Sequence, residues 1–343
     1  MTRRHFTQNI LGSAVLTQMP NFLGKKPDQP PFIAPIKPQR LCEGDTIGLI
    51  APAGNITDIR VQKAVANIQS LGFKVKMGRH ILDKYGYLAG SELRRVEDIH
   101  AMFSDPEVRG IWCVRGGYGV TRLLHLLDYK LIKKNPKPLI GYSDITALHQ
   151  AIFIKTGMVG FHGQIAAADW SDYTIQHLKN VLMHPSPEYT IALMAESESG
   201  YTTEIINQGV AEGRLMGGNL SLLASLTGTD YEWWLRDSLV FMEDIEEKPY
   251  RIDRMLTQLL AAGELQKAKG IALGVFHKCE PDANEDSFSL MEVLRDRLGS
   301  LNVPIVYGLS FGHIKHQCLL PVGIQARLDT QNRTLTLLEA AVS

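Results

Sequence analysis

The chain has 343 residues, of which 45% are hydrophobic and 21% charged, the composition of a soluble globular protein. At this length we expect two domains rather than one. The 36 basic and 36 acidic residues balance, and no apolar run has the length of a membrane span. We therefore expect no nucleic-acid partner and no stable membrane insertion.

Residues 1–40 are interpreted as a leader that precedes the folded part. Arg3 and Arg4 are followed by Phe6 and a short apolar segment, a pattern that resembles a twin-arginine export signal and predicts a periplasmic location. The apolar segment is interrupted, and no A-x-A cleavage site follows it. The alternative is therefore a disordered basic tail on a cytoplasmic protein.

From residue 45 onward, short apolar strands alternate with amphipathic helices. The expected strands are 46–51, 73–77, 110–114 and 139–140, and the expected helices are 59–71, 91–103 and 120–127. Strand–helix alternation with short connections predicts a doubly wound parallel sheet in an N-terminal α/β domain over 41–183. Ligands bind such sheets at the carboxyl ends of the strands.

Ser143 lies on the turn between one of these strands and the next helix. Gly141 and Tyr142 precede it, and apolar residues recur at helical spacing after Asp144. A serine on such a turn presents its hydroxyl above the sheet, beside free backbone N–H groups, as a nucleophile requires. The second glycine of Gly-x-Ser-x-Gly is absent, so a serine that only caps the helix is the alternative.

The segment Arg115-Gly-Gly-Tyr-Gly119 directly follows the strand at 110–114. Its glycines allow the backbone to approach a ligand and to turn N–H groups toward it. One interpretation is an oxyanion hole formed with the Asp144 N–H group, and the other is an ordinary tight turn. A nucleotide-phosphate loop is disfavoured because G-x-G-x-x-G and the Walker lysine are missing.

A polar segment over 184–207 predicts a linker to a second α/β domain over 208–343, which ends in a β-rich tail. Near its start, Gly217, Gly218 and Asn219 precede a helix. They could cradle a carboxylate there, although a plain Asn helix cap explains them equally well.

Glu243 and His313 each lie at the end of an expected strand in the second domain. A serine, an acid and a histidine at strand ends can be brought together by folding, whatever their order in the chain. A metal site built from His313, His316 and His277 is disfavoured, because neither C-x-x-C nor H-E-x-x-H occurs.

Six short motifs occur in order from about residue 36 to the C-terminus. They are Gly44–Ala53, Arg115–Gly119, Gly141–Asp144, Gly213–Leu220, Glu243–Asp244 with Tyr250–Arg254, and Phe311–His313. Each is weak alone, but the ordered set resembles the LD-carboxypeptidase family of serine peptidases, which includes muropeptide carboxypeptidases and the microcin C immunity protein.

The resemblance implies a catalytic triad that works through an acyl-enzyme, with Ser143 as nucleophile, His313 as general base and Glu243 as the residue that orients it. It also implies an active site at the domain interface and a small peptide substrate that is cut at the L,D bond before a C-terminal D-amino acid, as in a muropeptide tetrapeptide. The implied oxyanion groups are the N–H groups of Asp144 and of Gly116 or Gly117. No metal and no organic cofactor is implied.

A substrate of this kind carries a free carboxylate one residue beyond the cut, so the site needs a cation or a cluster of N–H groups there. The candidate substrate-binding residues are Arg115, Tyr118, Gly217, Gly218 and Asn219.

Two other functions remain open on the same fold. One is hydrolysis of a peptidyl nucleotide, which stacking by Trp170, Trp233 or Trp234 would favour. The other is a non-catalytic peptide-binding protein, which would need no triad. Assembly into a homodimer also stays open.

Overall fold

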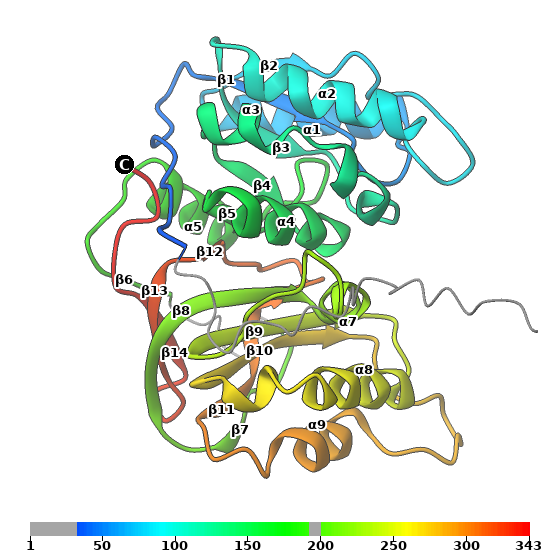
Figure 1. The fold of residues 1–343 in the computed structure, drawn as a ribbon, viewed down its shortest axis with the longest axis vertical. Helices are drawn as coiled ribbons and strands as arrows, with labels where there is room; N and C mark the ends of the chain where they lie inside the picture. The colour runs from blue at the N-terminus through cyan, green and yellow to red at the C-terminus, as the bar shows by residue number, and fades with distance from the viewer. Residues whose placement is uncertain (1–32, 192–199) are drawn as a thin grey trace, which may run out of the picture. The chain divides into compact units, whose positions relative to one another are not determined.

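The computed structural model describes residues 33–191 and 200–343. The strands of this part of the chain form two sheets, which lie one above the other in Figure 1. Most of the predicted leader, including Arg3 and Arg4, lies outside the described residues. Within the described ranges, no helix combines the length and the apolar character needed to cross a membrane.

The first sheet has the order β12-β5-β4-β3-β1-β2. Its parallel strands are β1 (Thr46–Ile50), β2 (Lys74–Met77), β3 (Val108–Cys113), β4 (Leu139–Gly141) and β5 (Gly160–His162). Its helices are α1 (Asp58–Ser70), α2 (Glu92–Ser104), α3 (Tyr129–Lys134), α4 (Thr146–Thr156) and α5 (Asp172–Leu182). The predicted parallel α/β architecture is confirmed.

The second sheet has the order β6-β14-β13-β8-β9-β10-β11-β7. Four central strands run parallel: β8 (Val210–Asn219), β9 (Ser238–Ile245), β10 (Gly270–His277) and β11 (Ile305–Gly312). The helices α7 (Leu220–Leu226), α8 (Pro249–Ala261) and α9 (Leu290–Leu298) accompany them. The outer strands β6 (Tyr189–Ile191), β7 (Glu204–Asn207), β13 (Gln325–Asp329) and β14 (Thr334–Leu337) pair antiparallel.

Three segments differ from the sequence-based expectation. The helix expected over 120–127 is two 3-10 turns, Val120–Arg122 and Leu124–Leu126. The segment 184–207, expected to be a linker, contributes β6 and β7 to the second sheet. The C-terminal tail supplies β12 (Leu320–Val322), which pairs antiparallel with β5 in the first sheet.

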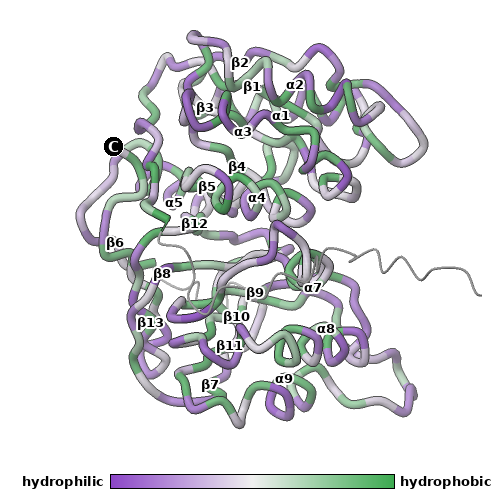
Figure 2. Tube along the Cα trace, viewed as in Figure 1, coloured by the Kyte–Doolittle hydropathy of each residue, from purple (hydrophilic) through white to green (hydrophobic). Residues whose placement is uncertain are grey.

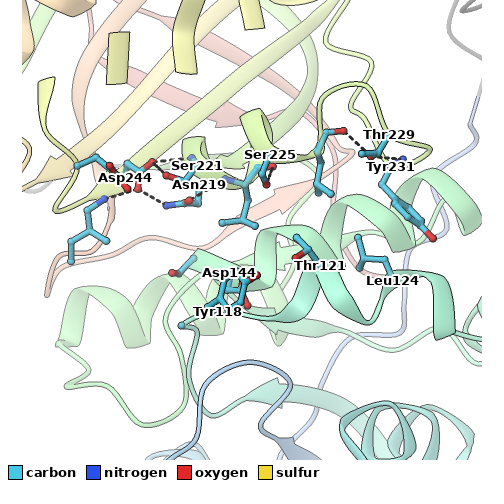
Figure 3. Close-up of a pocket in the computed structure, with 16 residues that line it drawn as sticks. Tyr118, Thr121, Leu124, Asp144, Asn219, Ser221, Ser225, Thr229, Tyr231 and Asp244 are labelled. Atoms are coloured by element: carbon cyan, nitrogen blue, oxygen red, sulfur yellow. Dashed lines mark hydrogen bonds between the residues drawn. The ribbon is translucent and has the colours of Figure 1, made fainter. Parts of the chain in front are cut away.

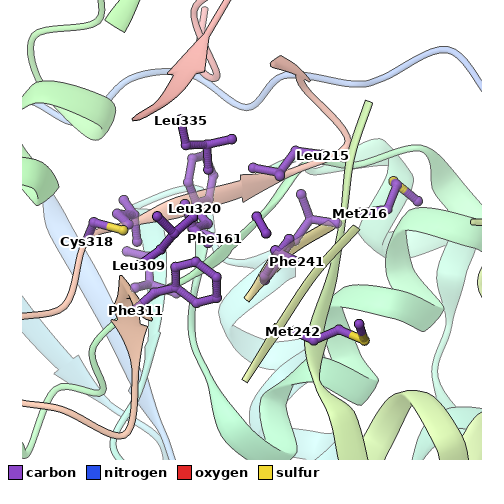
Figure 4. Close-up of a cluster of buried hydrophobic side chains, with 14 of the residues drawn as sticks. Phe161, Leu215, Met216, Phe241, Met242, Leu309, Phe311, Cys318, Leu320 and Leu335 are labelled. Carbon is purple, nitrogen blue, oxygen red and sulfur yellow. The ribbon is translucent and has the colours of Figure 1, made fainter. Parts of the chain in front are cut away.

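The hydrophobic core extends through both sheets. Phe161 of β5, Leu320 of β12, Phe241 of β9 and Phe311 of β11 belong to one buried cluster, part of which is drawn in Figure 4. In Figure 2, hydrophobic segments lie mainly along the inner strands, and hydrophilic segments lie mainly on the surrounding loops. A shared core of this kind fixes the strand ends of the two sheets against each other.

Candidate active site

Ser143 occupies a strained turn directly after β4. The strand ends at Gly141, and Ser143 begins the short 3-10 turn Ser143–Ile145 that leads into α4. Its φ of +64° lies in the left-handed region, which is uncommon for a residue that carries a Cβ. Backbone strain is found preferentially at functional sites, where the surrounding structure stabilises the unfavourable conformation.

His313 and Glu243 form a hydrogen-bonded pair from neighbouring parts of the second sheet. The Nδ1 atom of His313, which directly follows β11, lies 2.7 Å from Oε2 of Glu243, near the end of β9. The Glu243 side chain is fully buried, with an exposed fraction of 0%, and that of His313 is largely buried at 13%. A hydrogen bond to Nδ1 leaves Nε2 of the imidazole free to act on another group.

The electrostatics of the pair favour the charged forms. Burial works against ionisation of Glu243, but the charge and hydrogen bond of His313 bring the pKa of this carboxyl below its ordinary value. Burial likewise works against the imidazolium, but the Glu243 carboxylate raises the pKa of His313 above its ordinary value. The carboxylate therefore stabilises a histidine that has taken up a proton.

Tyr142 connects the pair to the turn that carries Ser143. Its ring centroid lies 4.7 Å from that of His313, and Tyr142 directly precedes Ser143 in the chain. The three predicted triad residues therefore belong to one region at the strand ends of the two sheets, although their roles stay a prediction.

The segment 115–119, called the glycine loop below, lies against Ser143. A Cβ built on Gly116 would stand 3.0 Å from Cβ and 3.2 Å from Oγ of Ser143, so only a glycine leaves this space open. Gly117 has a φ of +126°, which requires glycine. Gly116 therefore lies against Ser143, and Gly117 lines the same cavity as Ser143. Their role in an oxyanion hole stays a prediction.

Asp144 links the Ser143 turn to the end of the glycine loop by a hydrogen bond. Its buried carboxylate accepts a hydrogen bond of 2.9 Å from the Val120 N–H group, which directly follows the loop. Burial raises the pKa of Asp144 to about 6, while the Val120 N–H group and Arg95 oppose the shift.

Asn219 forms hydrogen bonds with both carboxylates near the end of β9, those of Glu243 and Asp244. Its amide nitrogen donates to Glu243 Oε1 at 3.3 Å and to Asp244 Oδ1 at 3.0 Å, and its Oδ1 accepts from Leu222 N–H as the cap of α7. The main-chain N–H group of Asn219 donates to Thr146 Oγ1 of α4. These bonds make Asn219 a link between α4, α7 and the acid of the pair.

Gly217 and Gly218 permit close packing of β8. A Cβ on Gly217 would lie 1.9 Å from the Phe241 carbonyl oxygen, and one on Gly218 would lie 2.4 Å from Thr146 Cγ2. The predicted carboxylate cradle at residues 217–219 is thus occupied by protein contacts, and substrate binding there stays a prediction.

A cavity of about 660 Å³ opens beside Ser143. In Figure 3, Asp144, Tyr118, Thr121 and Leu124 lie on one side, and Asn219, Ser221, Ser225 and Asp244 lie on the other. Both domains therefore contribute to its walls. The lining combines polar side chains with leucine, isoleucine and tyrosine, so the cavity offers both hydrogen-bonding groups and apolar surface to a peptide.

A second, more open cavity of about 390 Å³ adjoins the first at Gly117 and Tyr118. Arg115 lines it together with Tyr87, whose ring packs edge-on against Tyr118 at 5.6 Å. Two main-chain carbonyls hold the guanidinium, since Nη1 donates to Asn55 O at 2.8 Å and Nε to Gly116 O at 3.1 Å.

Two family models together account for most of the chain. The LD-carboxypeptidase N-terminal domain matches residues 47–163, and the LD-carboxypeptidase C-terminal domain matches residues 212–328. The chain belongs to the LD-carboxypeptidase family. The resemblance predicted from the ordered motifs is thereby confirmed.

Members of the LD-carboxypeptidase family from several bacteria are similar to this chain. A probable murein peptide carboxypeptidase of Bacillus subtilis is 42% identical over 313 residues, which covers 90% of this chain and 95% of the relative. The murein tetrapeptide carboxypeptidase of Pseudomonas aeruginosa is 32% identical, with coverages of 82% and 92%.

Solved structures of the LD-carboxypeptidase family share the fold. The microcin C7 self-immunity protein MccF superposes with a TM-score of 0.83 at 26% identity, covering 90% of this chain and all of MccF. A muramoyltetrapeptide carboxypeptidase from Oxalobacter formigenes gives a TM-score of 0.73 at 32% identity, with coverages of 85% and 97%.

Proposed function

We propose that this protein is a serine LD-carboxypeptidase that removes a C-terminal D-amino acid from a murein tetrapeptide. The observation that carries the proposal is the buried Glu243–His313 hydrogen bond of 2.7 Å beside the strained turn of Ser143. The murein peptide carboxypeptidases among the relatives support the substrate class.

In this proposal Ser143 Oγ attacks the carbonyl carbon of the scissile bond while His313 Nε2 takes the hydroxyl proton. Glu243 accepts a hydrogen bond from Nδ1 and stabilises the imidazolium that forms. The imidazolium then protonates the leaving amine, and the C-terminal amino acid departs. A water molecule, deprotonated by His313, hydrolyses the acyl-enzyme and restores Ser143.

The N–H groups of the glycine loop and of Asp144 stabilise the negative oxygen of the tetrahedral intermediate in this proposal. The placement of Gly116 against Ser143 supports it, because an oxygen bound there would find no side chain in its way.

Arg115 and Tyr118 bind the free carboxylate end of the peptide in this proposal. The two main-chain bonds of Arg115 fix the plane of its guanidinium, and it lines the cavity that joins the Ser143 cavity at Gly117. A cation fixed at the start of the glycine loop suits a carboxylate one residue beyond the scissile bond.

Hydrolysis of a peptidyl nucleotide, the second candidate, is supported by the similarity to MccF, a protein that has been solved in complex with aspartyl sulfamoyl adenosine. Two of the three predicted stacking residues give it little support. Trp170 packs on Trp112 with ring centroids 4.8 Å apart, and Trp233 is buried against Phe153. We therefore place the murein peptide first.

We also propose that the leader with Arg3 and Arg4 exports the folded enzyme to the periplasm, where murein peptides are released. Replacing both arginines by lysine should keep the protein in the cytoplasm, as measured by cell fractionation. The same distribution for both forms would contradict export by this route.

The substrate is tested with three tetrapeptides: one ending in D-alanine after an L-centre, its C-terminal amide, and the all-L version. Chromatography of free alanine should show release from the first peptide alone. Equal cleavage of all three would contradict recognition of the D-configured carboxyl end.

A further inference from the structure

Arg95 is a buried cation on the inner face of α2, with an exposed fraction of 1%. Burial lowers its pKa, and the carboxylates of Glu92 and Asp144 oppose the shift. Its Nε and Nη2 atoms are buried without a hydrogen-bond partner in the described part of the chain. A guanidinium with unmet N–H groups is costly to bury, so packing alone does not explain this residue.

The bonds that Arg95 does make hold the glycine loop. Nη1 donates to the carbonyl oxygens of Pro52 at 2.7 Å and of Gly119 at 3.0 Å. At the other end of the loop, the Gly54 N–H group donates to the Gly116 carbonyl at 3.3 Å. The turn that follows β1 therefore anchors the loop at both ends, directly at Gly116 and through Arg95 at Gly119.

Gly119 is connected to the nucleophile through two peptide links and one hydrogen bond. Val120, the next residue, donates its N–H group to the Asp144 carboxylate, and Asp144 directly follows Ser143. The opposite end of the loop lies against Ser143 at Gly116. A displacement of Gly119 would therefore change the position of the loop N–H groups relative to Ser143 Oγ.

We propose that Arg95 is a positioning residue for the reaction. It holds the N–H groups of the glycine loop at a fixed position relative to Ser143 Oγ. The proposal rests on the proposed function, because the loop acts there as part of the oxyanion hole. Arg95 acts on the loop through Gly119 and Asp144, so its loss should lower kcat. Any rise in KM should be smaller, because Arg115, the proposed substrate-binding cation of the loop, keeps its own bonds to Asn55 O and Gly116 O.

The test compares Arg95→Met, which removes the cation at similar size, with Arg95→Lys, which keeps donors for the two carbonyls. Arg94→Met is the matched control, because Arg94 directly precedes Arg95 in α2 and pairs with Asp83 at the surface. For each protein, kcat and KM for D-alanine release are measured together with the thermal unfolding midpoint. A second assay measures the rate at which diisopropyl fluorophosphate labels Ser143, by mass spectrometry.

We expect Arg95→Met to lower kcat roughly 10²-fold, the scale of losing one oxyanion-hole donor, and to slow the labelling of Ser143. Arg95→Lys should recover most of the loss, and Arg94→Met should behave as wild type. If Arg95→Met does not fold, Arg95→Gln takes its place. A folded Met or Gln variant with wild-type kcat and wild-type labelling would overturn the proposal, as would a loss confined to KM.

The labelling assay separates the two proposals. If the wild type is labelled but releases no D-alanine, the proposed substrate is wrong, and the labelling rates of the Arg95 variants still decide the positioning role. If Ser143 of the wild type is not labelled at all, the nucleophile assignment and the role of Arg95 are both overturned.

Discussion

Glu243 and Asp244 are consecutive residues of β9, yet both carboxyl groups are buried and one amide, that of Asn219, is bonded to both. Asp244 also accepts hydrogen bonds from the N–H group and hydroxyl of Ser221. Burial and the charge of Glu243 raise the pKa of Asp244 to about 6. The two neighbours thus differ in acidity, since the pKa of Glu243, the partner of His313, lies below its ordinary value.

The Glu243–His313 pair predicts how activity depends on pH. His313 accepts a proton only when neutral, and Glu243 raises its pKa, so kcat/KM should rise as pH increases through the raised His313 pKa. Glu243→Gln removes the negative charge, and the acidic limb should then shift to lower pH while the plateau falls by about 10²-fold or more. The measurement is the pH profile of kcat/KM for both proteins. An unshifted limb would assign the titration to another group.

The backbone conformation of Ser143 predicts that two substitutions lower turnover equally but differ in their effect on stability. Ser143→Ala and Ser143→Gly should each lower turnover by ~10⁴-fold, because the hydroxyl is lost. Ser143→Gly should also unfold at a higher temperature than Ser143→Ala, since glycine adopts the φ of +64° without the cost of roughly 1 kcal/mol that a Cβ incurs. Scanning calorimetry of the two variants measures this difference. A less stable glycine variant would mean that the turn is unstrained.

Asp144 predicts a pH-dependent loss of stability. Its folded pKa of about 6 lies above its ordinary value of 3.8, so the folded state binds the proton more tightly. Its contribution to stability is then present at low pH and lost as pH rises from about 4 to about 6. Asp144→Asn removes this titration, and its free energy of unfolding relative to wild type should increase over that range by at most about 3 kcal/mol. Urea unfolding at pH 4, 5, 6 and 7 tests this window, and a constant difference would contradict it.

The close approach of Gly116 to Ser143 predicts that Gly116→Ala selectively lowers activity. The added Cβ would stand 3.2 Å from Ser143 Oγ, where it obstructs the attacking oxygen, and we expect turnover to fall by roughly 10²-fold. Gly270→Ala is the control, since its Cβ would meet the Leu239 and Ala211 side chains in the second sheet. That variant should lose stability but keep its turnover per folded molecule. Equal turnover of Gly116→Ala and wild type would exclude a tight fit between the glycine loop and the nucleophile.

Several features of the site follow from local sequence patterns. Alternating strands and helices indicated the parallel sheet, and the rule that ligands bind at strand ends indicated the region of Ser143, Glu243 and His313. The positive φ of Ser143 was not predictable, because no local signal sets a serine in the left-handed region. Asp144 was predicted only through its N–H group, whereas the structure also shows its carboxylate bonded to Val120.

The burial of Arg95 is indicated by the spacing of apolar residues in its helix. Arg95, Ile99 and Met102 recur at helical spacing, and all three are buried on the inner face of α2. The expectation for this helix concerned only its extent, residues 91–103. Strand pairings such as β12 with β5 were beyond sequence reasoning, because the partners lie far apart in the chain and each is only three residues long.

The pairing of β12 with β5 has a consequence for biosynthesis. Leu320–Val322 emerge from the ribosome almost last, after His313, yet they complete the edge of a sheet whose other strands were all made before residue 163. A nascent chain that halts before His313 exposes the edge of β5 and lacks the general base of the proposed triad. Vectorial synthesis therefore delays assembly of the proposed hydrolytic centre until translation is nearly complete.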